Sequence, residues 1–280
     1  MVEQVGFGNI WELKLSDFPQ LKERWHDQLP FNFCRILANL TVDDCAFVSN
    51  AIPSNLLQFM NNLRRLYVRN CDSLEEVFHL EGLNAEEGHA QLLPNLKQLQ
   101  LIDLPRLKDI CSRDPQGILD FKNLKSLKIH NCSSLRDLFT PSMASALVQL
   151  HKIEIRNCAM MKKIITEERV EEAATYRIIF PVLKVIVLES LHSLTSIYSG
   201  TGILGIPSLE EIGIDNCPNL KTFISSFLSE HIPISVNNRD KNIDYVSKTM
   251  IFPLHHFSIV RSVSLCEAFS RLSTTFSSNM

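Results

Sequence analysis

The sequence lacks an excess of charge of either sign. Its 28 Lys and Arg residues against 31 Asp and Glu residues leave a formal net charge of −3 at pH 7. Proteins that bind nucleic acid or an anionic membrane through charge carry a strong basic excess or a basic stripe. The composition therefore predicts no nucleic-acid partner.

Long hydrophobic runs are also missing. No apolar run approaches the roughly 20 residues of a membrane-spanning helix. The opening stretch, MVEQVGFGNIWELKL, has neither the basic start nor the apolar segment of a signal peptide. We expect a cytoplasmic protein without a transmembrane segment, whose eight cysteines stay reduced.

The motifs of cofactor and metal chemistry are absent as well. The sequence contains no G-x-x-x-x-G-K-[ST], no G-x-G-x-x-G and no H-E-x-x-H, so phosphate-cradling and metalloprotease sites have no support. It has no C-x-x-C pair or His residues at ligand spacing, which argues against zinc. No acid, base and nucleophile recur together. We predict a protein that is not an enzyme and has no cofactor.

What the sequence does contain is one repeated pattern, L-x-x-L-x-L-x-x-C-x-x-L. The pattern is plainest in LKSLKIHNCSSL at 124–135 and LHKIEIRNCAMM at 150–161. Eight units match it at steps of 26 to 33 residues, close to the period of a leucine-rich repeat. The units begin at Ile10, Leu37, Leu63, Leu96, Leu124, Leu150, Leu183 and Leu209.

The units form blocks of three, which indicates a duplicated block. The first unit of each block has Phe18, Leu104 or Leu191 at its ninth position, whereas cysteine stands there at Cys45, Cys71, Cys132, Cys158 and Cys217. The two longest steps contain an acidic insertion, within 75–87 and 166–172. We predict a solenoid of about eight rungs over 1–223. An atypical C-terminal repeat region follows over 224–280, with a strand near 254–260.

The spacing of the pattern predicts a fold. An alternating L-x-L segment is a short strand with one buried face, and the remaining residues return the chain one rung further, so the strands stack in parallel about 4.8 Å apart. Each rung is stable only against its neighbours. We expect an α/β, open leucine-rich-repeat solenoid, or horseshoe, with a parallel β-sheet on the concave face and irregular or short helical convex connections. The ninth-position cysteine is a structural residue that fills a tight corner.

Residues that alternate with the buried leucines face the concave side, where repeat proteins usually bind their partners. Along the solenoid these residues are basic in the middle and acidic at both ends. Arg and Tyr are frequent among interface hot spots. The candidate protein-binding residues are Arg65, Tyr67, Arg69, Lys128, His130, Lys152 and Arg156. The alternative, that they are ordinary solvated strand residues, stays open.

Several phrases resemble the repeats of one protein family. They are LPNLKQLQLIDLPRLKDIC at 93–111, FKNLKSLKIHNCSSLRDLF at 121–139, LVQLHKIEIRNCAMMKKII at 147–165 and IPSLEEIGIDNCPNLKTF at 206–223. With P-x-L before the strand, N-C after it and the acidic insertion, they look like the leucine-rich repeats of plant intracellular nucleotide-binding disease-resistance proteins of the coiled-coil class. The resemblance covers about 7–223.

The resemblance implies a protein-recognition and autoinhibitory region of a plant immune receptor. Its partner would be a pathogen effector, a guarded host protein or the nucleotide-binding module of the same receptor. No nucleotide-binding or coiled-coil segment precedes Met1, so we expect a fragment of a longer receptor or a free-standing truncated repeat protein. The alternative from another class is the substrate-recognition region of an F-box ubiquitin ligase, although the sequence has no F-box segment.

Overall fold

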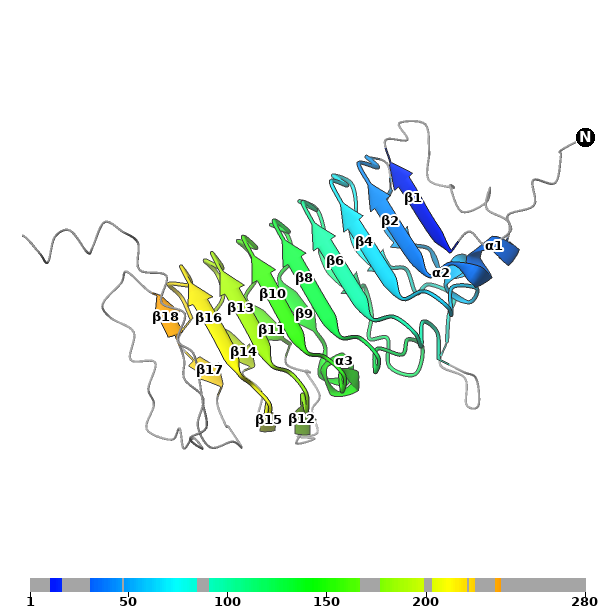
Figure 1. The fold of residues 1–280 in the computed structure, drawn as a ribbon. Helices are drawn as coiled ribbons and strands as arrows, with labels where there is room; N and C mark the ends of the chain where they lie inside the picture. The colour runs from blue at the N-terminus through cyan, green and yellow to red at the C-terminus, as the bar shows by residue number, and fades with distance from the viewer. Residues whose placement is uncertain are drawn as a thin grey trace, which may run out of the picture.

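The computed structural model describes residues 11–16, 31–46, 48–84, 91–166, 177–198, 203–220, 222–224 and 235–237. In these residues the chain winds through successive rungs that stack side by side (Figure 1). Four predicted features lie wholly or partly outside the described residues: the strand near 254–260, residues 85–87 of the first acidic insertion, residues 167–172 of the second, and the ninth position of the first unit, Phe18.

In the part of the chain that the structure describes, the strands of the repeat pattern and one further strand form a parallel sheet of nine strands. Neighbouring strands pair without slippage, as in Leu99 with Leu127 and Leu127 with Ile153. The pattern therefore predicted eight of these strands correctly. The sheet consists of β1 (Glu12–Ser16), β2 (Asn39–Asp43), β4 (Arg65–Arg69), β6 (Gln98–Ile102), β8 (Ser126–His130), β10 (Lys152–Arg156), β13 (Val185–Glu189), β16 (Glu211–Asp215) and β18 (Ser235–Asn237).

The ninth strand, β18, was not predicted. Its backbone pairs with β16, with Val236 opposite Ile214. Counting along this register, His231 and Arg239 stand where other rungs have leucine and cysteine. The sheet thus continues one rung beyond the last unit that the pattern identifies.

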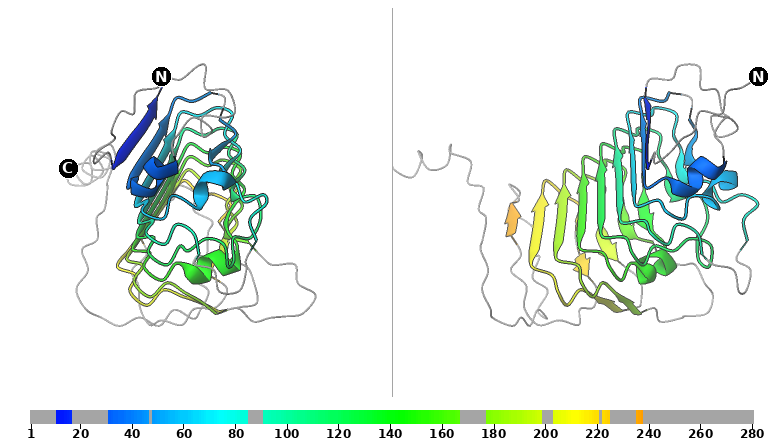
Figure 2. Two further views of the ribbon diagram at one scale, coloured as in Figure 1. Left: turned by 90° about the vertical axis from the view of Figure 1, so that its right-hand side faces the viewer. Right: turned by 45° about the vertical axis from the view of Figure 1, so that its right-hand side comes forward.

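The opposite side of the solenoid consists largely of three-residue parallel strands, which the sequence did not predict. Figure 2 shows this side facing the large sheet. Within the described ranges these strands form three small sheets. The first consists of β3 (Asn50–Ile52), β5 (Glu76–Phe78) and β7 (Asp109–Cys111), and the second of β9 (Asp137–Phe139), β11 (Lys163–Ile165), β14 (Ser196–Tyr198) and β17 (Thr222–Ile224). The third pairs β12 (Arg177–Ile179) with β15 (Ile203–Gly205). The expected short helices are α1 (Phe31–Ile36), α2 (Ser54–Leu57) and α3 (Pro141–Ala146).

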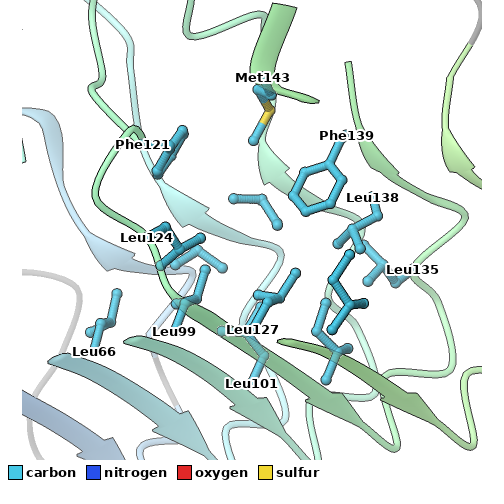
Figure 3. Close-up of a cluster of buried hydrophobic side chains, with 14 of the residues drawn as sticks. Leu66, Leu99, Leu101, Phe121, Leu124, Leu127, Leu135, Leu138, Phe139 and Met143 are labelled. Atoms are coloured by element: carbon cyan, nitrogen blue, oxygen red, sulfur yellow. The ribbon is translucent and has the colours of Figure 1, made fainter. Parts of the chain in front are cut away.

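The core lies between the two sides. Leu66, Leu99 and Leu127 of adjacent strands are fully or almost fully buried. In Figure 3 the leucines of the large sheet point toward Phe139 and Met143 of the other side. This continuous layer explains why one rung depends on the next.

The turn after each strand explains the recurring Asn-Cys pair. Asn131 and Asn157 have φ values of 55° and 54°, a left-handed conformation that Asn tolerates better than most residues. The Asn157 side chain donates to Asn131 Oδ1 at 3.0 Å, so the carboxamides connect adjacent rungs. Cys132 Sγ donates to the carbonyl oxygens of His130 and Leu101, 3.4 and 3.8 Å away. Its thiol is buried and free, as expected for a structural residue.

Candidate protein-interaction surface

The outward-facing side chains of the large sheet form three rows, which we call the strand surface. The register aligns the first, third and fifth residues of consecutive strands, for example Tyr67, Gln100 and Lys128 in the middle row. All seven predicted binding residues belong to these rows. They fall into two groups, one on β4 and one on β8 and β10, with the neutral residues of β6 between them.

The first group consists of Arg65, Tyr67 and Arg69. Both arginines are exposed, and the Tyr67 hydroxyl donates to Gln98 Oε1 at 2.8 Å. Arg69 forms an ion pair of 2.9 Å with Asp43 on β2. Arg65 has no ion-pair partner among the residues that the structure describes. Of the two arginines, Arg65 is therefore the one whose charge is not locally neutralised.

Asp43, opposite Arg69 on the neighbouring strand β2, carries a buried carboxylate. The residue is 7% exposed and accepts hydrogen bonds from Arg69 and Asn70, both at 2.9 Å. Burial alone would raise the pKa of Asp43, but these hydrogen bonds and the nearby Arg69 and Lys14 charges lower the pKa below its ordinary value. Asp43 therefore stays ionised and compensates the cations around it.

The second group surrounds another buried carboxylate, Glu154 at the centre of β10. Glu154 is 9% exposed. Four basic side chains contact its oxygens: Lys152 and His130 at 2.9 Å, Arg156 at 3.1 Å and Lys128 at 3.8 Å. Burial acts to raise the pKa of Glu154, but the hydrogen bond from Lys152 and the surrounding positive charges outweigh burial and lower the pKa to about 2. Glu154 is thus the common partner of four predicted binding residues.

Two further effects lower the positive charge of the β8 and β10 group, one at His130 and one at Arg156. Burial, followed by the Lys128 charge, lowers the pKa of His130 despite the hydrogen bond to Glu154, which favours neutral His130 at pH 7. Arg156 also pairs with Glu189 on β13, at 2.5 Å. The β8 and β10 group is therefore much less positive than its sequence indicates.

Sequence reasoning placed Asp43 and Glu154 on the strand surface but assigned neither a role. The missing information was which residues lie opposite each other. Once the register is known, Glu154 must lie beside Lys128, because paired residues of adjacent strands are about 5 Å apart. The sequence did contain one signal for the role of Glu154: the K-I-E-I-R segment of β10 places this acid between two bases on the same face of the strand.

The surface changes character beyond β10. Val185 and Val187 of β13 are partly exposed and lie beside Glu211 and Gly213 of β16. A Cβ atom at Gly213 would meet nothing within 4 Å, so the space above this residue is open. On β13 and β16 the middle row is thus apolar, and acidic residues such as Glu189 and Asp215 lie beside it.

Within the described ranges, no group of three or more His, Cys, Asp or Glu side chains could hold a metal ion. No described helix is both long and apolar enough to cross a bilayer. The strand surface itself carries exposed arginines, a tyrosine and paired charges.

Comparisons with known proteins agree with the repeat pattern. The family described as plant disease resistance protein RPS2-like, leucine-rich repeats, matches residues 9–159 and 152–232. The Arabidopsis thaliana disease resistance protein SUMM2 is 27% identical over 120 residues, which is 41% of this chain and 12% of SUMM2. A second Arabidopsis thaliana relative, named as a disease resistance protein, is 28% identical over 136 residues, 48% of this chain and 14% of the relative.

Among solved structures, the leucine-rich repeat domain of the type III effector XopL gives a TM-score of 0.45 at 22% identity, over 77% of this chain and 71% of that domain. The matches to the Arabidopsis proteins cover only a small part of those relatives, as the shares above state. The match to the repeat family, in contrast, extends over most of this chain. The chain therefore belongs to the leucine-rich-repeat family of RPS2-like plant disease resistance proteins.

Proposed function

We propose that the chain is a protein-recognition region of a plant immune receptor, acts by binding rather than by catalysis, and works in the cytoplasm. Its partner on the strand surface is a pathogen effector, a host protein modified by one, or the nucleotide-binding module of the same receptor, which the repeats would hold in its inactive state. The family match supports the setting in plant defence. The strand surface supports the mode of action.

The observation that carries the proposal is the Arg65, Tyr67 and Arg69 group on β4, in which both arginines are exposed and Tyr67 is partly exposed. Arg and Tyr combine a large contact area with directional hydrogen bonding, and both are frequent hot-spot residues. Here the rigid pairing of β4 with β2 and β6 holds them in place. Since Glu154 compensates the β8 and β10 group, we place the centre of binding on β4.

The test uses Arg65→Glu combined with Tyr67→Ser, which leaves the Asp43 and Arg69 pair intact. The chain is fused to a biotin ligase in leaf cells, and labelled neighbours are compared between wild type and variant. The matched control is Arg136→Glu, which makes the same change in charge at an exposed position before β9. We expect partners to be lost with the β4 variant and retained with the control.

Circular dichroism verifies that both variants fold. Equal labelling of every partner by wild type and the folded β4 variant would contradict the assignment of binding to β4. Loss of the same partners with both variants would attribute the effect to net charge, and loss with the control alone would favour recognition by the second side; either result would contradict the proposal.

A further inference from the structure

A row of basic side chains runs along the edge of the large sheet where its strands begin. These residues immediately precede five consecutive strands, and four of them are exposed while His151 is partly exposed. We call this row the basic rim. It consists of Arg64, Lys97, Lys125, His151 and Lys184.

Backbone hydrogen bonds hold the basic rim in register. The amide of each residue donates to the carbonyl oxygen of the previous one, at 2.8 Å for Lys97 to Arg64, Lys125 to Lys97 and His151 to Lys125, and at 2.9 Å for Lys184 to His151. With strands about 4.8 Å apart, the five residues span about 19 Å. In Figure 1 the corresponding strands, β4 to β13, begin side by side.

The positive charge of the rim is not neutralised as it is on the strand surface. Arg64, Lys97 and Lys125 form no ion pair in the part of the chain that the structure describes. Lys184 pairs with Glu210 at 2.6 Å, and both side chains are about half exposed. None of the four residues that precede each of these five strands is acidic. Arg64, Lys97 and Lys125 therefore present their charge to solvent.

Three carboxamides beside the rim already have hydrogen-bond partners. The carboxamides of Asn62, Asn95 and Asn123 donate to backbone carbonyl oxygens of preceding rungs, at 2.6, 2.9 and 2.7 Å. Within the rim, His151 Nδ1 lies 2.6 Å from the Gln149 carbonyl oxygen, so the cations best placed for a ligand are those of the arginine and the lysines. No Phe, Tyr or Trp occurs among the four residues before each strand, so the rim lacks the aromatic platforms on which single-stranded nucleic acids stack.

We propose that the basic rim docks an extended acidic segment of a partner protein. A segment of about six residues in the extended conformation spans the same distance as the rim, and its alternate side chains lie on one side, about 7 Å apart. Long Lys and Arg side chains reach carboxylates at that spacing. The rim lies at the edge of the sheet, so it is a second contact surface beside the strand surface.

The test measures binding of a fluorescent peptide of about eight residues that alternates Glu with Ser, by anisotropy at low and physiological salt. The variant is Lys97→Glu with Lys125→Glu, and the matched control is Arg136→Glu with Lys162→Glu. The control pair has the same change in charge and also lies on adjacent rungs, where the Lys162 amide donates to the Arg136 carbonyl oxygen at 2.7 Å. A peptide with Gln for Glu tests the need for carboxylates.

We expect wild type to bind the Glu peptide with an affinity that falls as salt rises. The rim variant is expected to lose about tenfold or more in affinity, and the control less than about twofold. Equal losses of affinity in both variants would attribute the effect to net charge and overturn the proposal. Equal affinity of wild type for the Gln and Glu peptides would also overturn it, and so would the absence of binding by wild type. Tighter binding of a single-stranded oligonucleotide than of the Glu peptide would overturn the choice of an acidic protein segment.

Discussion

Replacing Glu154 by Gln tests the central electrostatic feature of the strand surface. Gln keeps the shape of Glu154 but removes the charge shared by Lys152, His130, Arg156 and Lys128. The pKa of Glu154 is lowered from 4.5 to about 2, which corresponds to about 3 kcal/mol of stability at neutral pH. The side chains of Lys152 and Arg156 are 45% and 38% exposed, so solvent screening reduces the expected loss to about 1 to 3 kcal/mol.

The sign of the pH dependence follows from the lowered pKa. The stabilisation by Glu154 is complete above the unfolded pKa of about 4.5 and is lost as the pH falls through the folded pKa of about 2. Urea denaturation of wild type and Glu154→Gln should therefore give a difference in unfolding free energy at pH 7 that shrinks steadily between pH 4.5 and pH 2.

The matched control is Glu211→Gln, an exposed residue on β16. Its effect should stay within about 0.5 kcal/mol at every pH. Equal stability of wild type and Glu154→Gln at pH 7 would refute the reasoning, and so would a difference that does not change with pH.

Three further predictions concern the repeat itself. Leu127→Ala should lower the unfolding free energy by about 2 to 5 kcal/mol because it leaves a cavity in the core, as urea denaturation would show; a loss below about 1 kcal/mol would contradict full burial. Asn157→Ala should cost about 1 to 2 kcal/mol and Asn157→Gly less, since Gly accepts the left-handed turn; equal melting temperatures of the two variants would exclude backbone strain as the cause. Cys132 and Cys158 should react with a thiol reagent only after unfolding because they are buried; rapid labelling of the folded chain would contradict this.

The fold was largely predictable because its core is periodic. Leucines that recur at fixed spacing along the chain, such as Leu99 and Leu127, occupy paired positions in the structure, so eight strands followed from the pattern. The strand β18 escaped prediction because the sequence has His231 and Arg239 at the two positions where most other units have leucine and cysteine. The three-residue strands of the second side are too short for alternation to reveal them.

The binding surface was predictable in position but not in charge. Alternation placed Lys128 and Glu154 on one face, yet it could not show that they are in contact, because the two residues belong to different rungs. The basic rim was missed for another reason. Lys97 and Lys125 precede the alternating segment, and the net charge of −3 conceals a local row of cations.

The most direct test of the account is a position-specific cross-link from the strand surface. Tyr67→p-benzoylphenylalanine keeps an aromatic side chain on β4, while the same photoreactive residue at Arg136 samples the second side. Each purified chain is irradiated in leaf extract, and cross-linked proteins are identified by mass spectrometry. Recognition through the strand surface predicts discrete partners cross-linked from position 67 and absent from position 136. Cross-links of equal yield from both positions, or from position 136 alone, would contradict it.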